Sequence, residues 1–274
     1  MTAQRPVLSA EETWQAYDRM EARLTAPLSE RMLDLARVGP GMRILDLATG
    51  RGEPAIPAAH RVGPGGSVLG IDISASMLAM ARQRADQQGV TNLDLRAMDA
   101  ASLEGIPSAH FHSTLVRWGL MYVDSPVAAL AGARRAMVPE GVLVAAVLAE
   151  PERCSYFSLP RRVLEKYRPL PPIDPASPGP FRYADVERLR EDLERADLNI
   201  EHVEELVLSV MEAETAPEVI AWVRAFGLTR LLNDLPEPAQ RSWEEEFAKE
   251  ADALRQDGFI RLGCATRIVV ASKA

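Results

Sequence analysis

Apolar segments of strand length alternate with helix-length segments between Met42 and Leu148, and this alternation is the strongest constraint on the fold. The first strand-like run, Met42 to Leu47, ends in a turn that holds Gly50 and Gly52, and Pro54 then suits the first turn of a helix. Strands that alternate with helices form a parallel sheet that is covered on both faces and joined by right-handed crossovers. We therefore predict a doubly wound α/β domain.

The later strands are expected where apolar and β-branched residues cluster. They are Val68–Ile71, Leu93–Ala97, a fourth strand that contains Thr114–Val116, then Val142–Leu148, Ile200–Val210 and Cys264–Ala271. Together with the first run they make a seven-stranded, mostly parallel sheet. Ser74 or Ser76 suits the N-cap of a helix that continues to Gln88.

Helical segments precede and interrupt this pattern, and we expect the insertions to form a cap. From about Ala10 to Val38 the apolar spacing is helical but is interrupted at Pro27, which predicts two short helices. Six prolines fall between Pro169 and Pro180, so this segment is expected to be a loop. Pro217–Leu232 and Glu237–Gln256 have the periodicity of amphipathic helices.

These features divide the chain into six expected segments. They are N-terminal helices (1–40), a cofactor-binding core (41–150), a proline-rich loop and cap segment (151–183), a core helix and strand (184–210), a helical cap insertion (211–260) and a final core strand (261–274).

Composition and charge narrow the range of partners. Lys and Arg number 31 against 39 Asp and Glu, so the formal charge is −8 and no excess of cations favours nucleic acid. The two cysteines, Cys154 and Cys264, form no metal-binding pair in the sequence and suit a reducing compartment. No apolar stretch approaches the ~18 residues of a membrane span, and the amino terminus lacks the apolar run of a signal peptide. We expect a cytoplasmic protein with no metal site.

The turn after the first strand is the expected ligand site, because open α/β sheets bind ligands at the carboxyl ends of their strands. Gly50 and Gly52 allow a ligand to approach the backbone closely, and the N–H groups that begin the next helix favour a carboxylate. Asp72 ends the second strand twenty residues after Gly52, where its carboxylate suits the two hydroxyls of a ribose. The pattern predicts a nucleoside site.

Spacing alone does not decide which nucleoside binds, since Ala55 also satisfies a loose dinucleotide pattern. Glu53 lies where the pyrophosphate of NAD would bind, and a carboxylate next to that dianion is unfavourable. S-adenosylmethionine has no phosphate, and its ammonium group suits an acidic partner such as Asp46 or Glu53. Electrostatics therefore favours S-adenosylmethionine.

Five short segments make a set that is more specific than the glycine turn alone. They are Ile44–Pro54, Val68–Ser74 with Met77 and Leu78, Met98–Ala100, Trp118–Asp124 and Pro139–Gly141. Together they resemble the class I S-adenosylmethionine-dependent methyltransferases, especially the small-molecule branch that includes the ubiquinone and menaquinone biosynthesis enzymes. The resemblance implies a Rossmann-like methyltransferase fold whose seventh strand is antiparallel. His112 departs from the family, which usually has Asp at the start of the fourth strand.

The resemblance also implies roles around the cofactor. Gly50 and Gly52 would pass the methionine moiety, Asp72 would hold the ribose, and Ile73 would pack on the adenine. The expected product of the reaction is S-adenosylhomocysteine.

Other implied contacts lie further along the chain. Asp99 would accept the adenine amino group with Ala100 beside it, Arg117 and Trp118 would border the sulfonium, and Tyr17 would fold over the cofactor. The complete expected cofactor-binding set is Tyr17, Asp46, Gly50, Gly52, Asp72, Ile73, Met77, Asp99, Ala100, Arg117 and Trp118.

Catalysis is less well defined by the sequence. Methyl transfer requires alignment of the acceptor with the S–CH3 bond, exclusion of water and, for some acceptors, a base. The four histidines are all predicted to lie away from the carboxyl edge of the sheet. Weaker candidates are Tyr122, Glu150 and Tyr183, and no catalytic residue is assigned.

We therefore predict an S-adenosylmethionine-dependent methyltransferase that acts on a small-molecule acceptor, as in secondary-metabolite or quinone-type biosynthesis. The alternatives are an NAD(P)-dependent oxidoreductase and an S-adenosylmethionine-binding protein that does not methylate. The acceptor, the methylated atom and the oligomeric state are left open, and a homodimer is one of the options.

Overall fold

The computed structural model describes residues 10–226 and 229–274. The first nine residues of the segment 1–40, predicted to hold the N-terminal helices, therefore lie outside the described residues. The chain divides into two compact units. The sheet unit comprises Pro27–Pro151, Pro172–Val207 and Ala265–Ala274, and the helical unit comprises Met1–Ala26, Glu152–Pro171 and Leu208–Cys264. Among the described residues, no helix is long and apolar enough to cross a membrane.

The strand order of the main sheet is β3-β2-β1-β4-β5-β8-β6. The strands are β1 (Arg43–Leu47), β2 (Ser67–Asp72), β3 (Leu93–Ala97), β4 (Phe111–Arg117), β5 (Met137–Leu148), β6 (Leu198–Ala213) and β8 (Phe259–Lys273), and the short β7 (Arg255–Gln256) pairs with β8. Neighbours among β1 to β5 pair in parallel, whereas β8 is antiparallel to β5. The predicted doubly wound, mostly parallel sheet is confirmed, with β7 as a small addition to the seven expected strands.

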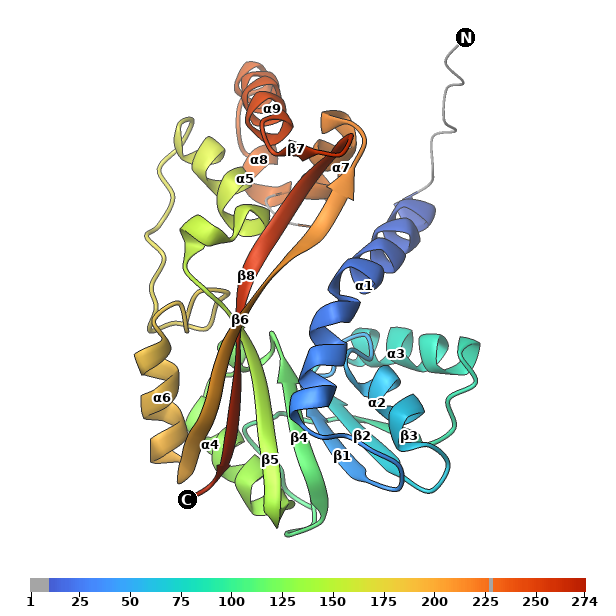
Figure 1. Ribbon diagram of the computed structural model, residues 1–274. Coiled ribbons are helices and arrows are strands. Elements are labelled where there is room, and N and C mark those ends of the chain that lie inside the picture. Colours follow the sequence, from blue (N-terminus) through green and yellow to red (C-terminus); the bar gives the residue numbers. More distant parts are fainter. Residues whose placement is uncertain (1–9, 227–228) are drawn as a thin grey trace. The chain divides into compact units, whose positions relative to one another are not determined.

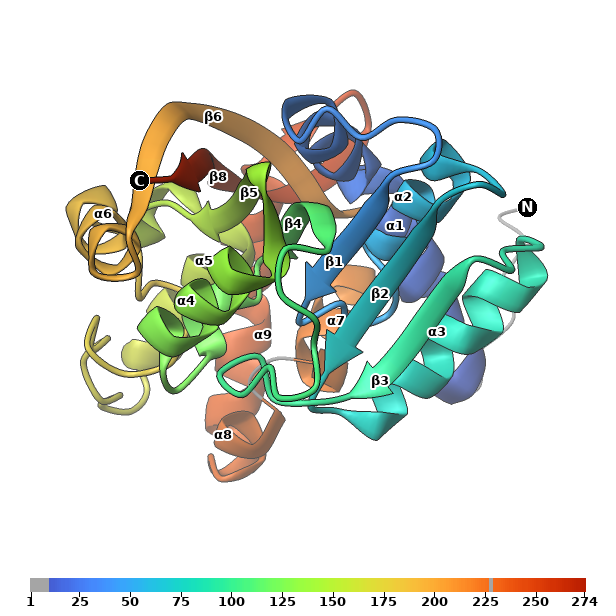
Figure 2. The ribbon, with the colours of Figure 1, turned by 90° about the horizontal axis from the view of Figure 1, so that it is seen from below.

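Helices cover both faces of the parallel strands (Figures 1 and 2). On one face lie α2 (Ala55–Val62) and α3 (Ala75–Gln87), and on the other lie α4 (Pro126–Ala136) and α6 (Val186–Arg195). Ser74, one of the two predicted N-caps, is the one used, because its hydroxyl accepts a hydrogen bond from the Met77 amide at 3.3 Å. The cap starts α3 directly after the carboxyl end of β2.

The amino-terminal segment corrects a prediction. It is one continuous helix, α1 (Ala10–Leu35), with Pro27 inside it, and not two short helices. A proline in a helix interior costs about 3 kcal/mol. Leu28, Met32 and Leu33 follow it and are fully buried, and each such side chain contributes about 1.5–3 kcal/mol. Burial of this face therefore outweighs the lost backbone hydrogen bond.

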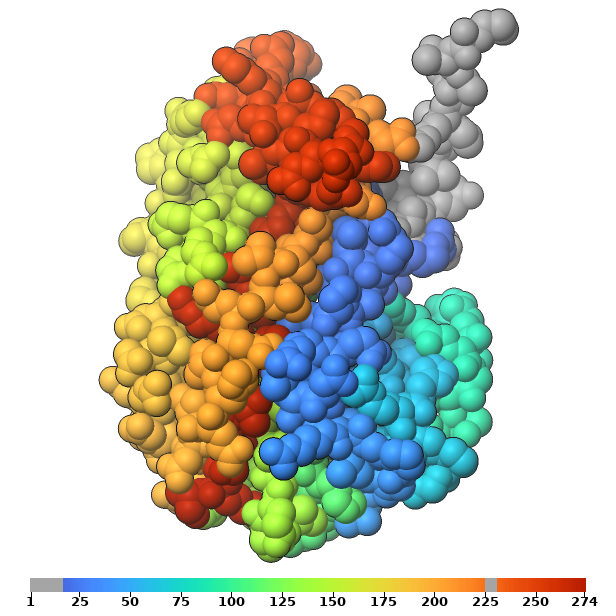
Figure 3. All heavy atoms as spheres, in the orientation of Figure 1, coloured from blue at the N-terminus to red at the C-terminus, as the bar shows by residue number. Residues whose placement is uncertain are grey.

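The carboxyl-terminal half of α1 is also tied to the sheet unit by an ion pair. The Arg31 guanidinium donates two parallel hydrogen bonds of 2.6 Å to the Glu204 carboxylate on β6. Within the sheet unit, Figure 3 shows the carboxyl-terminal half of α1, in blue, next to the β6 residues before Leu208, in orange. Arg31 holds the pKa of Glu204 well below its usual range, at about 2.

The helical unit has its own apolar core. Its helices are α5 (Ser155–Glu165), α7 (Ala216–Phe226), α8 (Thr229–Asn233) and α9 (Glu237–Asp252). The rings of Trp243 and Phe247 are fully buried and stack with centroids 4.9 Å apart. Within the predicted helix over 217–232 the structure describes α7 and α8, and residues 227–228 between them lie outside the described residues.

The proline-rich segment contains no helix or strand between α5 and α6, as predicted. Two short 3-10 helices, η1 (Leu120–Tyr122) and η2 (Pro151–Arg153), complete the elements.

Neighbouring hydroxyls on β4 give a test of the sheet-unit core. Ser113 donates a hydrogen bond of 2.9 Å to the Ala36 carbonyl oxygen, whereas the buried Thr114 hydroxyl has no partner in the part of the chain that the structure describes. We expect Thr114→Val to raise the free energy of unfolding by about 1 kcal/mol, and Ser113→Ala to lower it by about the same amount. Urea denaturation of both variants would check this, and equal destabilisation by the two would contradict it.

Candidate functional site

A cavity of about 440 Å³ lies at the carboxyl ends of β1, β2, β3 and β4 within the sheet unit. Its residues belong to the carboxyl end of β2, to the turns that follow the four strands, or to the start of α3. They are Ala48, Gly50, Asp72, Ile73, Ser74, Met77, Met98, Asp99, Ala100, Trp118, Gly119, Tyr122, Val123 and Asp124. The cavity therefore lies where open α/β sheets bind ligands.

Asp72 joins two of these turns. Its carboxylate accepts a 2.8 Å hydrogen bond from the Gly50 amide and another of 2.8 Å from the Ser74 amide. A carboxylate has about four lone-pair sites, so acceptor capacity is left for ligand hydroxyls. Gly50 has a φ of +54°, and a Cβ at this position would meet no atom within 4 Å, so the backbone there is open to a ligand.

The second glycine of the turn has a different role. A Cβ on Gly52 would lie 2.6 Å from the Ile56 Cδ1 atom, and its φ is +95°. Gly52 does not line the cavity and allows α2 to pack closely after the turn. Its predicted contact with the methionine moiety stays a prediction.

Strained backbone surrounds the cavity. Ala48 and Trp118 follow β1 and β4 and have φ values of 52° and 54°, a region unfavourable for residues with a side chain. Gly119, which follows Trp118, packs against Ala48, since a Cβ on it would be 2.4 Å from the Ala48 Cβ. The two strand ends therefore approach each other as closely as their backbones allow.

Asp46 lies beneath the glycine turn and does not line the cavity. It is fully buried, its Oδ2 accepts a 2.6 Å hydrogen bond from the Thr49 hydroxyl, and its Oδ1 has no hydrogen-bond partner among residues 10–226 and 229–274. Burial raises its pKa from 3.8 to about 7, against the opposing effects of Thr49, Arg117 and the Ala55 amide. A buried carboxyl with an unused oxygen is an unfavourable feature for stability alone.

Glu53 is held by the protein itself. Its carboxylate accepts a 3.0 Å hydrogen bond from the Ser29 hydroxyl and lies 3.8 Å from an Arg84 Nη atom. These contacts fix the glycine turn to α1 and α3. Glu53 is not among the residues that line the cavity.

The predicted adenine and sulfonium contacts converge in part. Ile73, Asp99, Ala100, Met77 and Trp118 all line the cavity. The Ile73 side chain is 79% exposed, as expected of an apolar surface that a flat ligand would cover.

Arg117 is the next residue before Trp118 and is absent from the lining. Its guanidinium carbon lies 5.2 Å from the centre of the Trp118 ring, and the Trp118 indole N–H donates a 3.2 Å hydrogen bond to the Thr266 hydroxyl. These two contacts fix the orientation of the ring.

The weaker candidates occupy different environments. Tyr122 lines the cavity and is 49% exposed. Glu150 pairs with Arg267, and Tyr183 is fully buried and donates a 2.9 Å hydrogen bond to Asp192, where burial raises the pKa of its phenol. Neither Glu150 nor Tyr183 lines the cavity.

Tyr17 belongs to the helical unit. Its hydroxyl donates a 2.8 Å hydrogen bond to the Glu218 carbonyl oxygen, and burial raises the pKa of the phenol to about 12. Its predicted place over the cofactor stays a prediction.

Six lining residues were absent from the predicted set. They are Ala48, Ser74, Met98, Gly119, Val123 and Asp124. Each lies within two residues of one that was selected, and Trp118–Asp124 was recognised as a motif. These residues could have been found from their position, because every residue of a turn at the carboxyl end of a strand can line the cavity, and not only the residue that a motif singles out.

None of the four histidines is among the residues that line the cavity. His112 instead accepts a 2.9 Å hydrogen bond on Nδ1 from the Arg43 amide, which ties the starts of β1 and β4 together. This contact explains the histidine at the start of the fourth strand.

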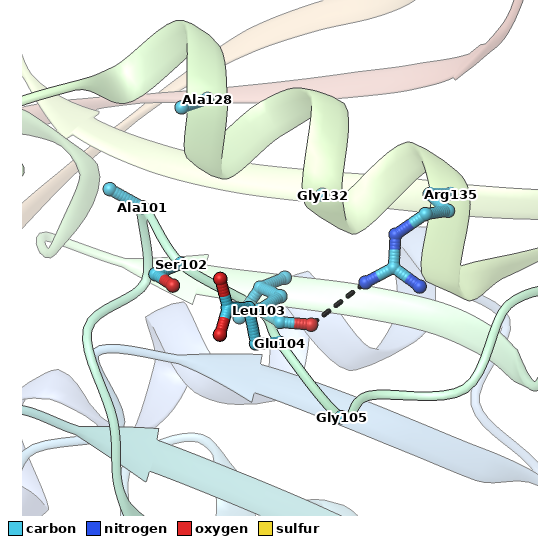
Figure 4. A pocket seen from close by; sticks show the side chains of 8 residues that line it. All are labelled: Ala101, Ser102, Leu103, Glu104, Gly105, Ala128, Gly132 and Arg135. Atoms are coloured by element: carbon cyan, nitrogen blue, oxygen red, sulfur yellow. Dashed lines mark hydrogen bonds between the residues drawn. The ribbon is translucent and has the colours of Figure 1, made fainter.

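A second hollow, of about 450 Å³, lies between the loop after Ala100 and α4 (Figure 4). Its charged residues are Glu104 and Arg135, and the Arg135 guanidinium donates hydrogen bonds of 2.8 Å to the Leu103 carbonyl and 2.7 Å to the Ile106 carbonyl. Arg135 thereby anchors the loop that continues from Asp99 and Ala100.

Comparison with known proteins defines the class. Residues 39–157 match the family described as "Methyltransferase domain". Aklanonic acid methyltransferase DauC of Streptomyces sp. (strain C5) is 36% identical over 115 residues, which are 42% of this chain and 52% of that protein. The ubiquinone/menaquinone biosynthesis C-methyltransferase UbiE of Shewanella frigidimarina is 31% identical over 135 residues, 49% of this chain and 52% of that protein.

The fold extends the similarity beyond these segments. The crystal structure of the cyclase SpnF has a TM-score of 0.57 and 20% identity, with 90% of this chain and 80% of that chain covered. The resemblance seen in the sequence is confirmed, and residues 39–157 form a methyltransferase domain of the S-adenosylmethionine-dependent class. The chain spans about half the length of the two curated relatives described above.

The raised pKa of Asp46 gives a pH test. An unfolded Asp ionises near pH 3.8 whereas the folded chain retains the proton up to about pH 7, so this group lowers stability progressively between those values and by a constant amount above them. We expect the stability of Asp46→Asn relative to the unsubstituted protein to increase between about pH 4 and pH 7, by an amount on the order of a few kcal/mol. Urea denaturation at a series of pH values measures the difference. The exposed Asp94→Asn is the matched control, and a pH-independent difference for Asp46→Asn would contradict the assignment.

Proposed function

We propose that this protein binds S-adenosylmethionine in the cavity of the sheet unit and transfers its methyl group to a small-molecule acceptor. The observation that supports this most directly is the charge of the cavity wall. Its ionisable carboxyls are Asp72, Asp99 and Asp124, and none of the described lining residues is a lysine, arginine or histidine. Such a wall favours a cation and disfavours a diphosphate.

The lining residues suit the parts of this cofactor. Asp72 would accept the ribose hydroxyls, the apolar Ile73 and Ala100 would enclose the adenine, and Asp99 would accept its amino group. Gly50 would allow the methionine moiety to approach the backbone. When bound, the cofactor supplies an electrophilic methyl group on a sulfonium.

The protein's own contribution would be orientation and exclusion of water. Trp118, fixed by Arg117 and Thr266, would form an apolar wall next to the reacting methyl, and Tyr122 would face the acceptor. Alignment of this kind is worth about 7–11 kcal/mol in favourable cases. Whether Tyr122 also exchanges a proton depends on the acidity of the acceptor.

The acceptor we propose is a secondary metabolite or a quinone precursor, because the similar proteins named above carry out aklanonic acid methylation and ubiquinone/menaquinone biosynthesis. Most of the helical unit lies outside the matched residues 39–157, so this similarity does not extend to it. We also propose that the partners do not include nucleic acid and that the protein is cytoplasmic. Cys154 and Cys264 are thiols and not disulfide partners, which is typical of a reducing compartment.

A second candidate function is an S-adenosylmethionine-binding protein that catalyses another reaction. One observation favours it: a chain of similar fold, SpnF, is named as a cyclase. Fold does not separate these two functions, because chemistry depends on the site. The oxidoreductase alternative receives no support from the acidic cavity wall.

Calorimetric titration with S-adenosylhomocysteine tests the cofactor. We expect micromolar or tighter binding by the unsubstituted protein and at least ~10-fold weaker binding by Asp72→Asn, which loses a charged acceptor and one of the two backbone contacts. Asp94→Asn, outside the cavity, should bind normally. Unchanged affinity in Asp72→Asn would remove the ribose assignment, and binding of NAD instead would overturn the proposal.

A transfer assay separates the two candidate functions. With S-adenosylmethionine carrying a labelled methyl group and a panel of polyketide acids and reduced quinones, we expect label in at least one acceptor. Consumption of an acceptor without incorporation of label, in a protein that binds S-adenosylhomocysteine, would favour the second candidate.

A further inference from the structure

The end of the proline-rich segment contacts the cavity wall from outside. The Gly179 amide donates a 3.0 Å hydrogen bond to the Met121 carbonyl oxygen, and Arg182 Nη1 donates one of 2.5 Å to the Val123 carbonyl oxygen. These two carbonyls belong to the residues on either side of Tyr122. The backbone that presents Tyr122 and Val123 to the cavity is therefore held at both ends by a segment nearly sixty residues further along the chain.

Arg182 is unusual in its surroundings. Arg182 is only 8% exposed. Among the described residues, its Nε has no hydrogen-bond partner and its guanidinium forms no ion pair. The backbone carbonyl oxygen of Val123 is the one hydrogen-bond acceptor found for the Arg182 side chain among the described residues. The nearby Arg267, by contrast, bonds to the Ala184 carbonyl and pairs with Glu150.

A buried guanidinium with an unused donor is costly for folding. Removing such a group from water is unfavourable unless its donors are satisfied, and apolar residues of similar volume often give equal or greater stability. Arg182 lines a surface hollow with Asp185 and Asp192, which favour a cation, but its Nε–H has no partner among the described residues and its one described side-chain hydrogen bond is to the Val123 carbonyl. The contact with the cavity wall is therefore the specific feature of this arginine.

We infer that Arg182 is a positioning residue, which holds the Tyr122–Asp124 wall in the conformation that binds ligand. The identity of that ligand rests on the function proposed above, whereas the effect on the wall does not. Loss of the guanidinium would release the Val123 carbonyl, and the turn would then sample conformations in which Tyr122 and Asp124 no longer face the cavity.

The turn contains its own reporters. The Tyr122 amide donates to the Gly119 carbonyl at 2.9 Å and the Val123 amide to the Leu120 carbonyl at 3.2 Å, so both should be protected from hydrogen exchange. Arg188 gives a matched control: it lines the same surface hollow as Arg182, and no hydrogen bond from its side chain is found among the described contacts.

The experiment compares Arg182→Met, Arg182→Lys and Arg188→Met. We expect amides of residues 119–124 to exchange at least ~10-fold faster in Arg182→Met than in Arg188→Met, with the amides of β2 unchanged and a Tm equal to or above that of the unsubstituted protein. Arg182→Lys keeps a charged donor and should show intermediate exchange. Affinity for S-adenosylhomocysteine should fall about 10-fold in Arg182→Met and stay normal in Arg188→Met.

The outcomes are distinct. If the unsubstituted protein does not bind S-adenosylhomocysteine, the proposed function fails, and the exchange rates still decide the role of Arg182. Equal exchange at 119–124 in all variants would overturn the positioning role, as would a loss of Tm with no local change. If Arg182→Met does not fold, faster exchange in Arg182→Lys than in the unsubstituted protein supports the role, and unchanged exchange overturns it.

Discussion

The arrangement of the site depends on one carboxylate. Asp72, at the end of β2, accepts the amides of Gly50 and Ser74 and so joins the glycine turn after β1 to the start of α3. These three residues also line the cavity. Without this acceptor the two turns would have unsatisfied N–H groups and no common register. The group that is expected to bind the ribose is therefore also the group that shapes the site.

The site is maintained at a cost in stability. Ala48 and Trp118 have unfavourable backbone conformations, and Asp46 is buried with an unused oxygen and a raised pKa. Each feature is worth on the order of 1–3 kcal/mol against folding. All three lie at the carboxyl ends of β1 and β4 or directly beneath them. Their concentration at one edge of the sheet marks that edge as functional independently of any comparison with other proteins.

Sequence patterns predicted the doubly wound, mostly parallel sheet and most of the residues that line the cavity, because those features depend on residue type. The turn after β1 needs Gly50 for its positive φ, and Asp72 ends β2 with a side chain that accepts hydrogen bonds without donating them. The continuity of α1 through Pro27 was not predictable from local spacing, because it depends on burial of Leu28 and Met32. The same holds for Gly52, whose role follows from the position of Ile56.

Backbone carbonyls explain why the supports of the cavity were missed. Arg135 bonds to the carbonyls of Leu103 and Ile106, and Arg182 bonds to that of Val123. Every residue has a carbonyl, so the acceptor leaves no mark in the sequence, and the arginines by themselves resemble any other surface cation. Both bonds hold loops that continue into cavity-lining residues. Guanidinium groups placed behind the wall can fix its shape while the wall itself stays acidic, which an arginine inside the cavity would not allow.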